Sequence, residues 1–353
     1  MPKRYLIYTK SDIENAQKIC AKHKGVRILH CHRHFPLILA EIDDIKRLSR
    51  HPDISHIEED IKIQAHRAVR VSARQPNVTF PWNIEMIKAP SVWPKSMGRG
   101  VRVGVLDTGI DYTHPALRGR VAGGYNAIAG NRHFMDDNGH GTHIAGIIAS
   151  SSRLAEVYGV SPRSSLYAIK VMNKDGSGRV SDTVRGIEWA IENNIQVLNM
   201  SLGSSQHSVA LEQATRKASQ KGMILVASAG NGGSVKELFG SNIDYPARFP
   251  WVISVGAVDK NMKRADFSSM GGRLDIMAPG VDIRSTWPGG KYKAESGTSM
   301  SAAHVSGAAA LLLARYQGMD GIKARNYLLR LNRRMGWRSQ YGKGLLNLSH
   351  LSR

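Results

Sequence analysis

Cysteine is scarce in this sequence. Only Cys20 and Cys31 occur, ten residues lie between them, and the rest of the chain has none. Two cysteines without a second pair make a poor zinc site. We therefore expect no disulfide framework to hold the fold together.

Long apolar runs are also missing. The longest spans Ala308 to Ala314, whereas a membrane helix needs about 20 apolar residues. The N-terminal MPKRYLIYTK continues into polar SDIENAQ, so no signal peptide is visible. We expect no membrane partner, a cytoplasmic location for the sequence as written, and secretion if a leader is missing from it.

Acidic residues are few. The chain has 28 Asp and Glu and 49 Lys and Arg, which gives a net charge of +21. Such a balance raises the question of nucleic acid or another anionic partner. The positive residues are scattered, with no run of five and no basic stretch like a known RNA- or DNA-binding module. We predict no specific nucleic-acid partner and a basic surface suited to an alkaline or anionic environment.

The chain has 353 residues, of which 42% are hydrophobic, enough for two packed domains. Residues 1–66 contain strand-like and helix-like segments in turn. In order these are RYLIYTK, DIENAQKICAKHKG, VRILHCH, PLILAEI, IDDIKRLSRHP and ISHIEED. This order predicts a small β-α-β-β-α-β, ferredoxin-like α+β domain. Residues 67–79 belong to a basic, turn-prone stretch that predicts a linker containing a processing site.

From residue 80 to 353 the pattern changes to buried strands that alternate with amphipathic helices. VRVGVLD, SLYAIKVM, IQVLNMSL, MILVASAG and WVISVGAV are nearly continuous apolar runs, typical of parallel strands covered on both faces. VSDTVRGIEWAIENN and SVALEQATRKASQKG have helical spacing between them. We predict a doubly wound, mostly parallel α/β domain with its ligand at the carboxyl ends of the strands.

Three segments place reactive residues at that edge of the sheet. Asp107 ends the strand in VGVLDTGID, His140 precedes a small-residue helix in DDNGHGTHIAGIIAS, and Ser299 starts an apolar helix in SGTSMSAAHVSGAAALLLA. A serine becomes a good nucleophile when an imidazole accepts its proton and a carboxylate orients that imidazole. Taken singly, the three are ordinary as a turn Asp, a structural or metal-binding His, and an N-cap Ser.

Together, DTGID, HGTHIAG and GTSMSAAH resemble the three signature segments of the subtilisin family of serine peptidases. The likeness runs from about Pro81 to Leu348 and includes NMSLG, SAGN, DIMAPG and YGKGLLN. Residues 1–66, which end near HIEED, resemble the pro-domain of that family, an intramolecular chaperone and inhibitor. This family's triad is itself a standard worked example of the mechanism.

The resemblance implies a role for each matching residue. Ser299 would attack the scissile carbonyl, His140 would act as base and then acid, and Asp107 would orient His140. Asn231, in SAGN, matches the oxyanion-hole asparagine, whose loss typically costs about 3–4 kcal/mol of transition-state stabilisation. Read alone, Asn231 is a turn residue before Gly232.

Substrate should bind as an added β-strand between two backbone edges. We expect these edges at Ser201, Leu202 and Gly203 and at Gly176, Ser177 and Gly178, where small residues let a second backbone approach. In the family, the residue before the Tyr-Pro that follows the oxyanion loop lies at the base of the first specificity pocket. Here it is Asp244, which would favour a basic residue such as the linker's Arg67, Arg70 or Arg74; an outward-facing loop Asp is the alternative.

The chain departs from the family pattern beside Ser299 and at the usual calcium ligands. Ser301 and Ala303 replace the usual flank, so Ala303 stands where proline is common. Ala116, Arg153 and Val78 stand where the tight calcium site has its ligands, and a hard cation needs several oxygens. We therefore expect no required cofactor, with a weak cation site at most near the carbonyls of Ala247, Phe249 and Val252.

The sequence thus predicts a monomeric serine endopeptidase that is made as a self-processing zymogen and acts on proteins and on its own pro-domain. The leading alternative is a catalytically weak binding protein whose pro-domain stays in the active-site cleft. A third, nucleic-acid binding, would show as steeply salt-dependent retention on DNA.

Overall fold

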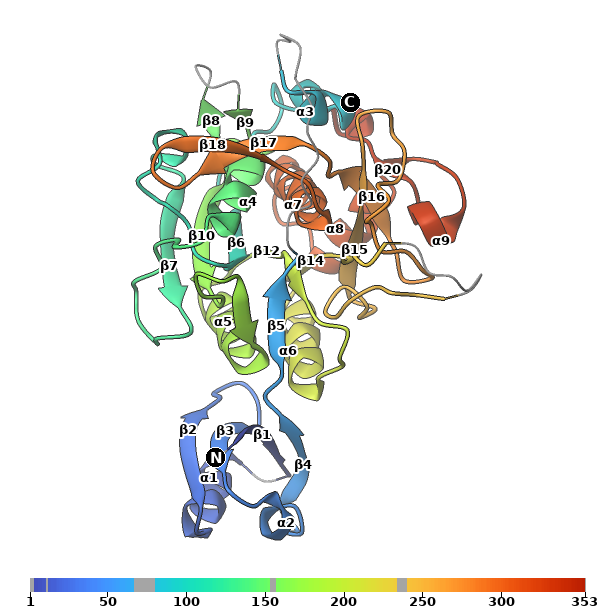
Figure 1. The fold of residues 1–353 in the computed structure, drawn as a ribbon. Coiled ribbons are helices and arrows are strands. Elements are labelled where there is room, and N and C mark those ends of the chain that lie inside the picture. Colours follow the sequence, from blue (N-terminus) through green and yellow to red (C-terminus); the bar gives the residue numbers. More distant parts are fainter. Residues whose placement is uncertain (1–2, 11, 67–79, 153–156, 234–239, 353) are drawn as a thin grey trace.

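The structure is a computed structural model that describes residues 3–10, 12–66, 80–152, 157–233 and 240–352 (Figure 1). The predicted linker, residues 67–79, therefore lies outside the described residues. Two bodies are seen, a small N-terminal domain and a large α/β domain. No helix among the described residues is both long and apolar enough to cross a membrane.

The N-terminal domain has the predicted β-α-β-β-α-β order. Its elements are β1 (Lys3–Thr9), α1 (Ile13–Lys22), β2 (Val26–Cys31), β3 (Leu37–Ile42), α2 (Ile45–Leu48) and β4 (Ile54–Glu59). The four strands form an antiparallel sheet in the order β2-β3-β1-β4. The first helix begins where the Asp12 carboxylate accepts a hydrogen bond from the Asn15 N–H at 2.8 Å, an ordinary N-cap.

The two faces of this small sheet have different neighbours, because successive side chains of a strand point to opposite faces. Ile7 and Ile38 pack with Ala16 and Cys20 of α1 in a local core. Leu6, Tyr8, Leu37 and Leu39 join the core of the large domain instead. The N-terminal domain therefore docks through its sheet against α5 and α6, below which it lies in Figure 1.

The large domain is built on a nine-stranded sheet in the order β19-β20-β16-β15-β14-β12-β6-β10-β7. Its strands are β6 (Arg102–Asp107), β7 (Val121–Asn126), β10 (Ser165–Lys170), β12 (Val197–Met200), β14 (Ile224–Ser228), β15 (Val252–Val258), β16 (Ile276–Pro279), β19 (Asn332–Arg333) and β20 (Leu345–Leu346). Pairing is parallel except between β19 and β20. The strand order reverses at β6, so the ligand crevice is expected at its carboxyl end.

Helices cover both faces of this sheet. The helices α4 (His140–Ala149) and α7 (Thr298–Arg315) share one core, while α5 (Val180–Glu192) and α6 (Val209–Gln220) share the other. The prediction of a doubly wound, mostly parallel sheet is confirmed. Burial on both faces explains why the strands are apolar throughout, as in β15, where every residue is buried.

The remaining elements are short or lie at the rim. They are α3 (Trp82–Met86), η1 (Ala89–Ser91), η2 (Pro115–Leu117), β8 (Ser151–Ser152), β9 (Val157–Tyr158), β17 (Ile283–Trp287), β18 (Lys291–Glu295), α8 (Gly321–Leu328), α9 (Arg338–Tyr341) and η3 (Ser349–Ser352).

A separate three-stranded sheet joins the two bodies. Its middle strand, β5 (Lys62–Ala65), follows the N-terminal domain and lies between β11 (Ser177–Arg179) and β13 (Leu202–Gly203) of the large domain. The sequence reading missed β5, because KIQA is too short and mixed to stand out. It also joined into one run the residues 195–202, which the structure divides between β12 and β13.

Candidate active site

Asp107 ends β6 at the point where the strand order reverses, and its side chain is fully buried. Its Oδ1 accepts a hydrogen bond from the Thr108 N–H at 2.7 Å. The Nδ1 atom of His140 lies 2.8 Å from Oδ1 and 3.0 Å from Oδ2. A carboxylate held in this way fixes the tautomer in which His140 carries its proton on Nδ1.

His140 begins α4, and the backbone before it is tightly packed. Gly139 has φ of 111°, a left-handed conformation that favours glycine. A Cβ on Gly141 would lie 2.1 Å from the Gly109 carbonyl oxygen, so the helix approaches the loop after β6 as only glycine allows. This approach brings the imidazole onto Asp107.

The environment of His140 favours its protonated form. Burial opposes the charge, but the charge of Asp107 and its hydrogen bond outweigh burial, so the pKa of His140 is raised above 6.5. Its Nε2 atom is buried and has no hydrogen-bond partner among the described residues. This nitrogen is therefore available to a group that enters the cleft.

Ser299 lies in the first turn of α7 and is fully buried. Its Oγ is 3.4 Å from the carbonyl oxygen of His66 and 3.4 Å from that of Ser201. The hydroxyl thus points toward the incoming chain, and no hydrogen bond to His140 is formed in this arrangement. Rotation about one side-chain bond changes the direction of Oγ.

Asn231 lies beside the start of α7. Its Oδ1 accepts hydrogen bonds from the N–H and the Oγ1–H of Thr298, both at 3.0 Å. A Cβ placed on Gly297 would lie 3.2 Å from Asn231 Nδ2 and 3.6 Å from the His66 carbonyl oxygen. The amide nitrogen and that carbonyl therefore border the same small space, which a side chain on residue 297 would fill.

The two expected substrate edges do hold an extended strand, and the strand is the chain's own β5. Ser177 and Gly178 pair with Gln64 and Ile63 on one side. Leu202 and Gly203 pair with Ala65 and Gln64 on the other, both antiparallel. The Ala65 N–H also donates to the Gly176 carbonyl at 2.9 Å.

His66 lines the cavity that also contains Asp244, where the sequence predicts the first specificity pocket. Its Nδ1 lies 2.6 Å from Ser228 Oγ, and its Nε2 lies 3.0 Å from Asp244 Oδ2. The Asp244 carboxylate therefore faces the pocket and does not point outward. Gly203 forms one wall, where a Cβ would lie 2.6 Å from the imidazole.

The sequence reading named Arg67, Arg70 and Arg74 as residues to fill that pocket, and all three lie outside the described residues. The residue that the structure brings to Ser299 is His66, which sequence reasoning missed. The sequence carries no clear signal for it, because His66 follows the short and mixed KIQA segment and its register in the cleft depends on tertiary packing.

Two carboxylates at the end of the N-terminal domain meet helix starts of the large domain. Glu58 accepts hydrogen bonds from the Ser208 hydroxyl and from the N–H groups of Val209 and Ala210, at 2.9, 3.0 and 2.9 Å. Asp60 accepts from the N–H and hydroxyl of Ser181 at 3.0 and 2.9 Å. Helix N-termini attract negative charge, so both contacts favour docking.

The unusual flank of Ser299 leaves α7 intact. The Ser301 hydroxyl donates to the carbonyls of Ala278 and Pro279 at 2.9 and 3.1 Å, which ties the helix start to β16. Ala303 is buried inside the regular helix. Replacement of the usual flank by serine and alanine therefore keeps the position of Ser299.

Little at the expected cation sites favours a cation. Ala116 is a buried apolar residue of η2, and Arg153 and Val78 lie outside the described residues. At the weaker site, Arg273 donates hydrogen bonds to the carbonyls of Arg248 and Phe249 at 3.3 and 3.2 Å. A guanidinium in that position repels a second cation.

His143, the other histidine of the HGTHIAG segment, has a structural contact. Its Nε2 lies 3.0 Å from the Lys293 carbonyl. Burial lowers its pKa to about 3, so the ring is neutral. It forms no metal-type cluster with His140 among the described residues.

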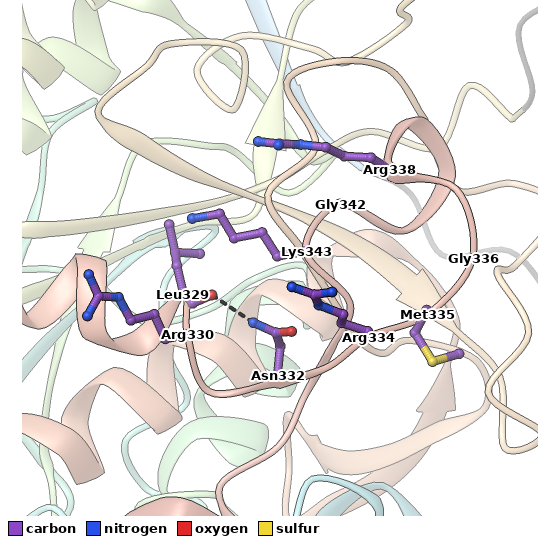
Figure 2. A pocket seen from close by; sticks show the side chains of 9 residues that line it. All are labelled: Leu329, Arg330, Asn332, Arg334, Met335, Gly336, Arg338, Gly342 and Lys343. Carbon is purple, nitrogen blue, oxygen red and sulfur yellow. Dashed lines mark hydrogen bonds between the residues drawn. The ribbon is translucent and has the colours of Figure 1, made fainter.

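A cavity of about 560 Å³ near α9 gathers positive charge without sharing a residue with this cleft (Figure 2). Arg330, Arg334, Arg338 and Lys343 line it, and no carboxylate does. Within Figure 2 the one hydrogen bond drawn joins Asn332 to the Leu329 carbonyl, at 2.9 Å. The basic excess of the sequence is thus partly concentrated here.

A buried carboxylate–imidazole pair and a serine at the start of a helix that shares the same core, on a parallel α/β sheet, are the groups of a serine hydrolase. Comparison with known proteins agrees. Residues 98–344 match the model of the subtilase family, peptidase family S8. The chain is 46% identical to subtilisin DY of Bacillus licheniformis over 271 residues, 76% of this chain and 97% of that protein.

Longer alignments include the N-terminal part. The alkaline protease of Alkalihalobacillus alcalophilus is 40% identical over 331 residues, 93% of this chain and 82% of that protein. The thermostable alkaline protease of Halalkalibacterium halodurans is 38% identical over 348 residues, 98% of this chain and 91% of that protein. The chain therefore belongs to the subtilase family. It is a serine endopeptidase with protein substrates.

Proposed function

We propose that this endopeptidase is made as a zymogen that cuts its own chain after His66. The observation that carries the proposal is the position of the His66 carbonyl oxygen, 3.4 Å from Ser299 Oγ, at the end of a strand paired on both sides. This contact holds the His66 carbonyl group next to the nucleophile on a fixed backbone, which is the positioning that an intramolecular attack needs. The bond presented is the one between His66 and Arg67.

In the proposed reaction Ser299 Oγ attacks the His66 carbonyl carbon while its proton passes to His140 Nε2. The negative charge that develops on the carbonyl oxygen is stabilised by Asn231 Nδ2 and by the Ser299 N–H. The C–N bond then breaks and His140 gives the proton to the departing amine of Arg67. Water repeats these steps to release His66 as a carboxylate. Asp107 orients His140 throughout.

Residues 1–66 act in this proposal as a pro-domain that assists folding and then inhibits. Its sheet shares a core with α5 and α6, and Glu58 and Asp60 bind the starts of α6 and α5. After the cut, β5 still occupies the cleft as a product strand. Activity then requires its release.

Substrate preference is proposed to follow the contacts of β5. His66 pairs with Asp244, so a positively charged residue before the scissile bond is favoured. Two residues earlier, Gln64 is exposed, and one further back Ile63 is fully buried in the shared core. An aliphatic residue at the fourth position before the cut should therefore also bind well. No metal is required for any step, and the chain is proposed to act as a monomer.

The test is Ser299→Ala in the full chain. We expect this variant to stay uncut, whereas the wild type yields a new N-terminus at Arg67, read by intact mass and N-terminal sequencing. Ser301→Ala serves as the control, since its hydroxyl contacts only β16 carbonyls, and should mature normally. Maturation of Ser299→Ala in pure solution would contradict self-processing.

The same experiment tests the alternative of a binding protein with a permanently docked pro-domain. A fluorophosphonate probe labels Ser299 only when the cleft is open. Labelling that appears after maturation supports the zymogen, and a wild-type chain that never labels supports the alternative.

A further inference from the structure

Two histidines and a glutamate meet where the N-terminal domain contacts α5. His30 lies on β2 and His32 follows the strand on the same side, while Glu188 belongs to α5 of the large domain. One nitrogen or oxygen of each lies within 4.8 Å of the others. The two imidazole rings are 4.8 Å apart between centroids and nearly perpendicular, at 88°.

One ring nitrogen of this cluster is left without a partner. His32 Nδ1 lies 2.7 Å from Glu188 Oε2, and the side chain is only 1% exposed. Its Nε2 is buried and has no hydrogen-bond partner among the described residues. A buried polar atom that stays unsatisfied destabilises the fold, so its retention calls for a ligand.

The geometry of His32 matches that of a metal ligand. A metal-bound histidine usually donates its other N–H to a carboxylate, which fixes the tautomer and directs the free lone pair at the ion. Glu188 is itself held in place, because its Oε1 accepts the His34 N–H at 3.2 Å. The carboxylate therefore orients His32 from the Nδ1 side of the ring, and a bound ion lies on the opposite, Nε2 side.

The charges beside the cluster are mixed. Glu188 supplies the carboxylate, while Arg185 and Arg33 are the nearby cations, and Arg185 is held by the Ala127 carbonyl through Nη1.

We propose that His30 and His32, with His32 oriented by Glu188, bind a divalent transition-metal ion of the zinc class at the contact between the N-terminal and peptidase domains. Two imidazoles and water molecules suit the tetrahedral coordination that zinc prefers, whereas calcium and magnesium need more oxygen ligands. Because Glu188 of the peptidase domain holds the His32 ring, the ion strengthens the contact between the two domains and slows their separation. Its effect on activation rests on the proposed zymogen function, but the binding of metal does not.

The experiment uses the full-length Ser299→Ala variant from which metal has been removed. Intact mass first establishes whether this variant is uncut. Zinc is titrated by calorimetry, and cobalt replaces it to report tetrahedral ligands by visible absorption. We expect one ion per chain and a higher melting temperature with zinc. His30→Gln and Glu188→Gln should each weaken binding at least about tenfold.

His34→Gln is the matched control, because His34 pairs with Glu192 of the same helix at 3.3 Å without belonging to the cluster. It should change zinc affinity less than about twofold, a shift within the ordinary effect of a surface substitution. Equal loss in all three variants, or zinc binding that none of them changes, would overturn the proposal. Melting of each variant without metal checks that it is folded.

The wild-type chain then tests whether the metal slows activation. Zinc should lengthen the delay before activity appears, and His30→Gln should abolish that zinc-dependent delay. If Ser299→Ala is cut but still binds zinc through His30, self-processing fails and the metal site stands. If it stays uncut and binds no zinc, the metal site fails and the zymogen stands.

Discussion

At the scale of single residues, the cleft depends on a few polar atoms held by their neighbours. Asp107 and His140 are fixed by the end of β6 and the start of α4, and Asn231 is held by Thr298. Each has a defined direction because its other atoms are already bonded. Catalysis benefits from such fixed groups, which need not reorganise when charge develops.

Asp244 should set the preference for the residue before the scissile bond. Asp244→Asn keeps the shape of the side chain but removes the charge that His66 meets. We expect the advantage of Arg, Lys or protonated His over Leu or Phe to fall about five- to tenfold, as for loss of one charge-assisted hydrogen bond. Peptides varied at that one position, compared by kcat/KM, give the measurement.

Asp175→Asn is the control for this variant, since Asp175 lines a cavity of about 360 Å³ that His140 also lines and Asp244 does not. It removes the same charge from the cleft rim and should leave the ranking unchanged. If the wild type shows no preference for basic residues, Asp244 does not determine the preference for the residue before the scissile bond.

The pH dependence of activity should follow His140. The attack needs neutral His140, and its pKa is raised above 6.5 because Asp107 outweighs burial. Activity should therefore be low at and below pH 6.5 and rise with a midpoint above that value. A pH profile of kcat/KM on the matured enzyme measures this, and a midpoint below 6.5 would contradict it.

At the scale of elements, helix starts organise both chemistry and docking. Ser299 and His140 lie at the starts of α7 and α4, while Glu58 and Asp60 bind the starts of α6 and α5. The unpaired N–H groups of a first helical turn attract negative charge. Helix starts thus bind two carboxylates at the domain contact, and we propose that the start of α7 stabilises an oxyanion in the cleft in the same way.

Glu58→Gln should loosen the N-terminal domain. The amide keeps the shape but loses the charge that faces the start of α6, worth about 0.3–1 kcal/mol and up to about 2 kcal/mol when partly buried. We expect the delay before activity to shorten about two- to tenfold, read from the time course of peptide hydrolysis. Glu59→Gln, whose exposed side chain meets only Lys3 at 3.5 Å, should keep the wild-type delay.

At the scale of the whole molecule, the two bodies share one hydrophobic core, since Leu37 and Leu39 of the small sheet pack with α5 and α6. Burial of that apolar surface favours the docked state. The extended strand β5 then enters the cleft as a continuation of the same contact.

Calcium should matter little to the stability of the matured enzyme. Ala116 offers no side-chain ligand, and Arg273 occupies the carbonyls of Arg248 and Phe249. A ligand stabilises only in proportion to its binding, so chelation should lower the melting temperature by less than about 2 °C. The matured form is used because it lacks His30 and His32. A large drop that calcium reverses would reveal a tight site elsewhere.

The sequence by itself determined the fold class, the helix and strand order of the N-terminal domain, five central strands of the large sheet, and the candidates Asp107, His140, Ser299 and Asn231. These are local signals, because strand periodicity, glycine placement and short motifs are written in neighbouring residues. Their catalytic roles stay predictions. The family was likewise visible in segments such as HGTHIAG, and the comparisons confirm it.

Only the tertiary structure decided what lies in the cleft and what joins the domains. Three contacts show this: His66 meets Asp244, β5 lies between the two edges, and His32 reaches Glu188. Each joins residues more than 110 positions apart. No periodicity encodes such a pair, because its register depends on how two packed bodies fit. Burial of the small sheet on α5 and α6 fixes that fit, and the polar contacts follow from it.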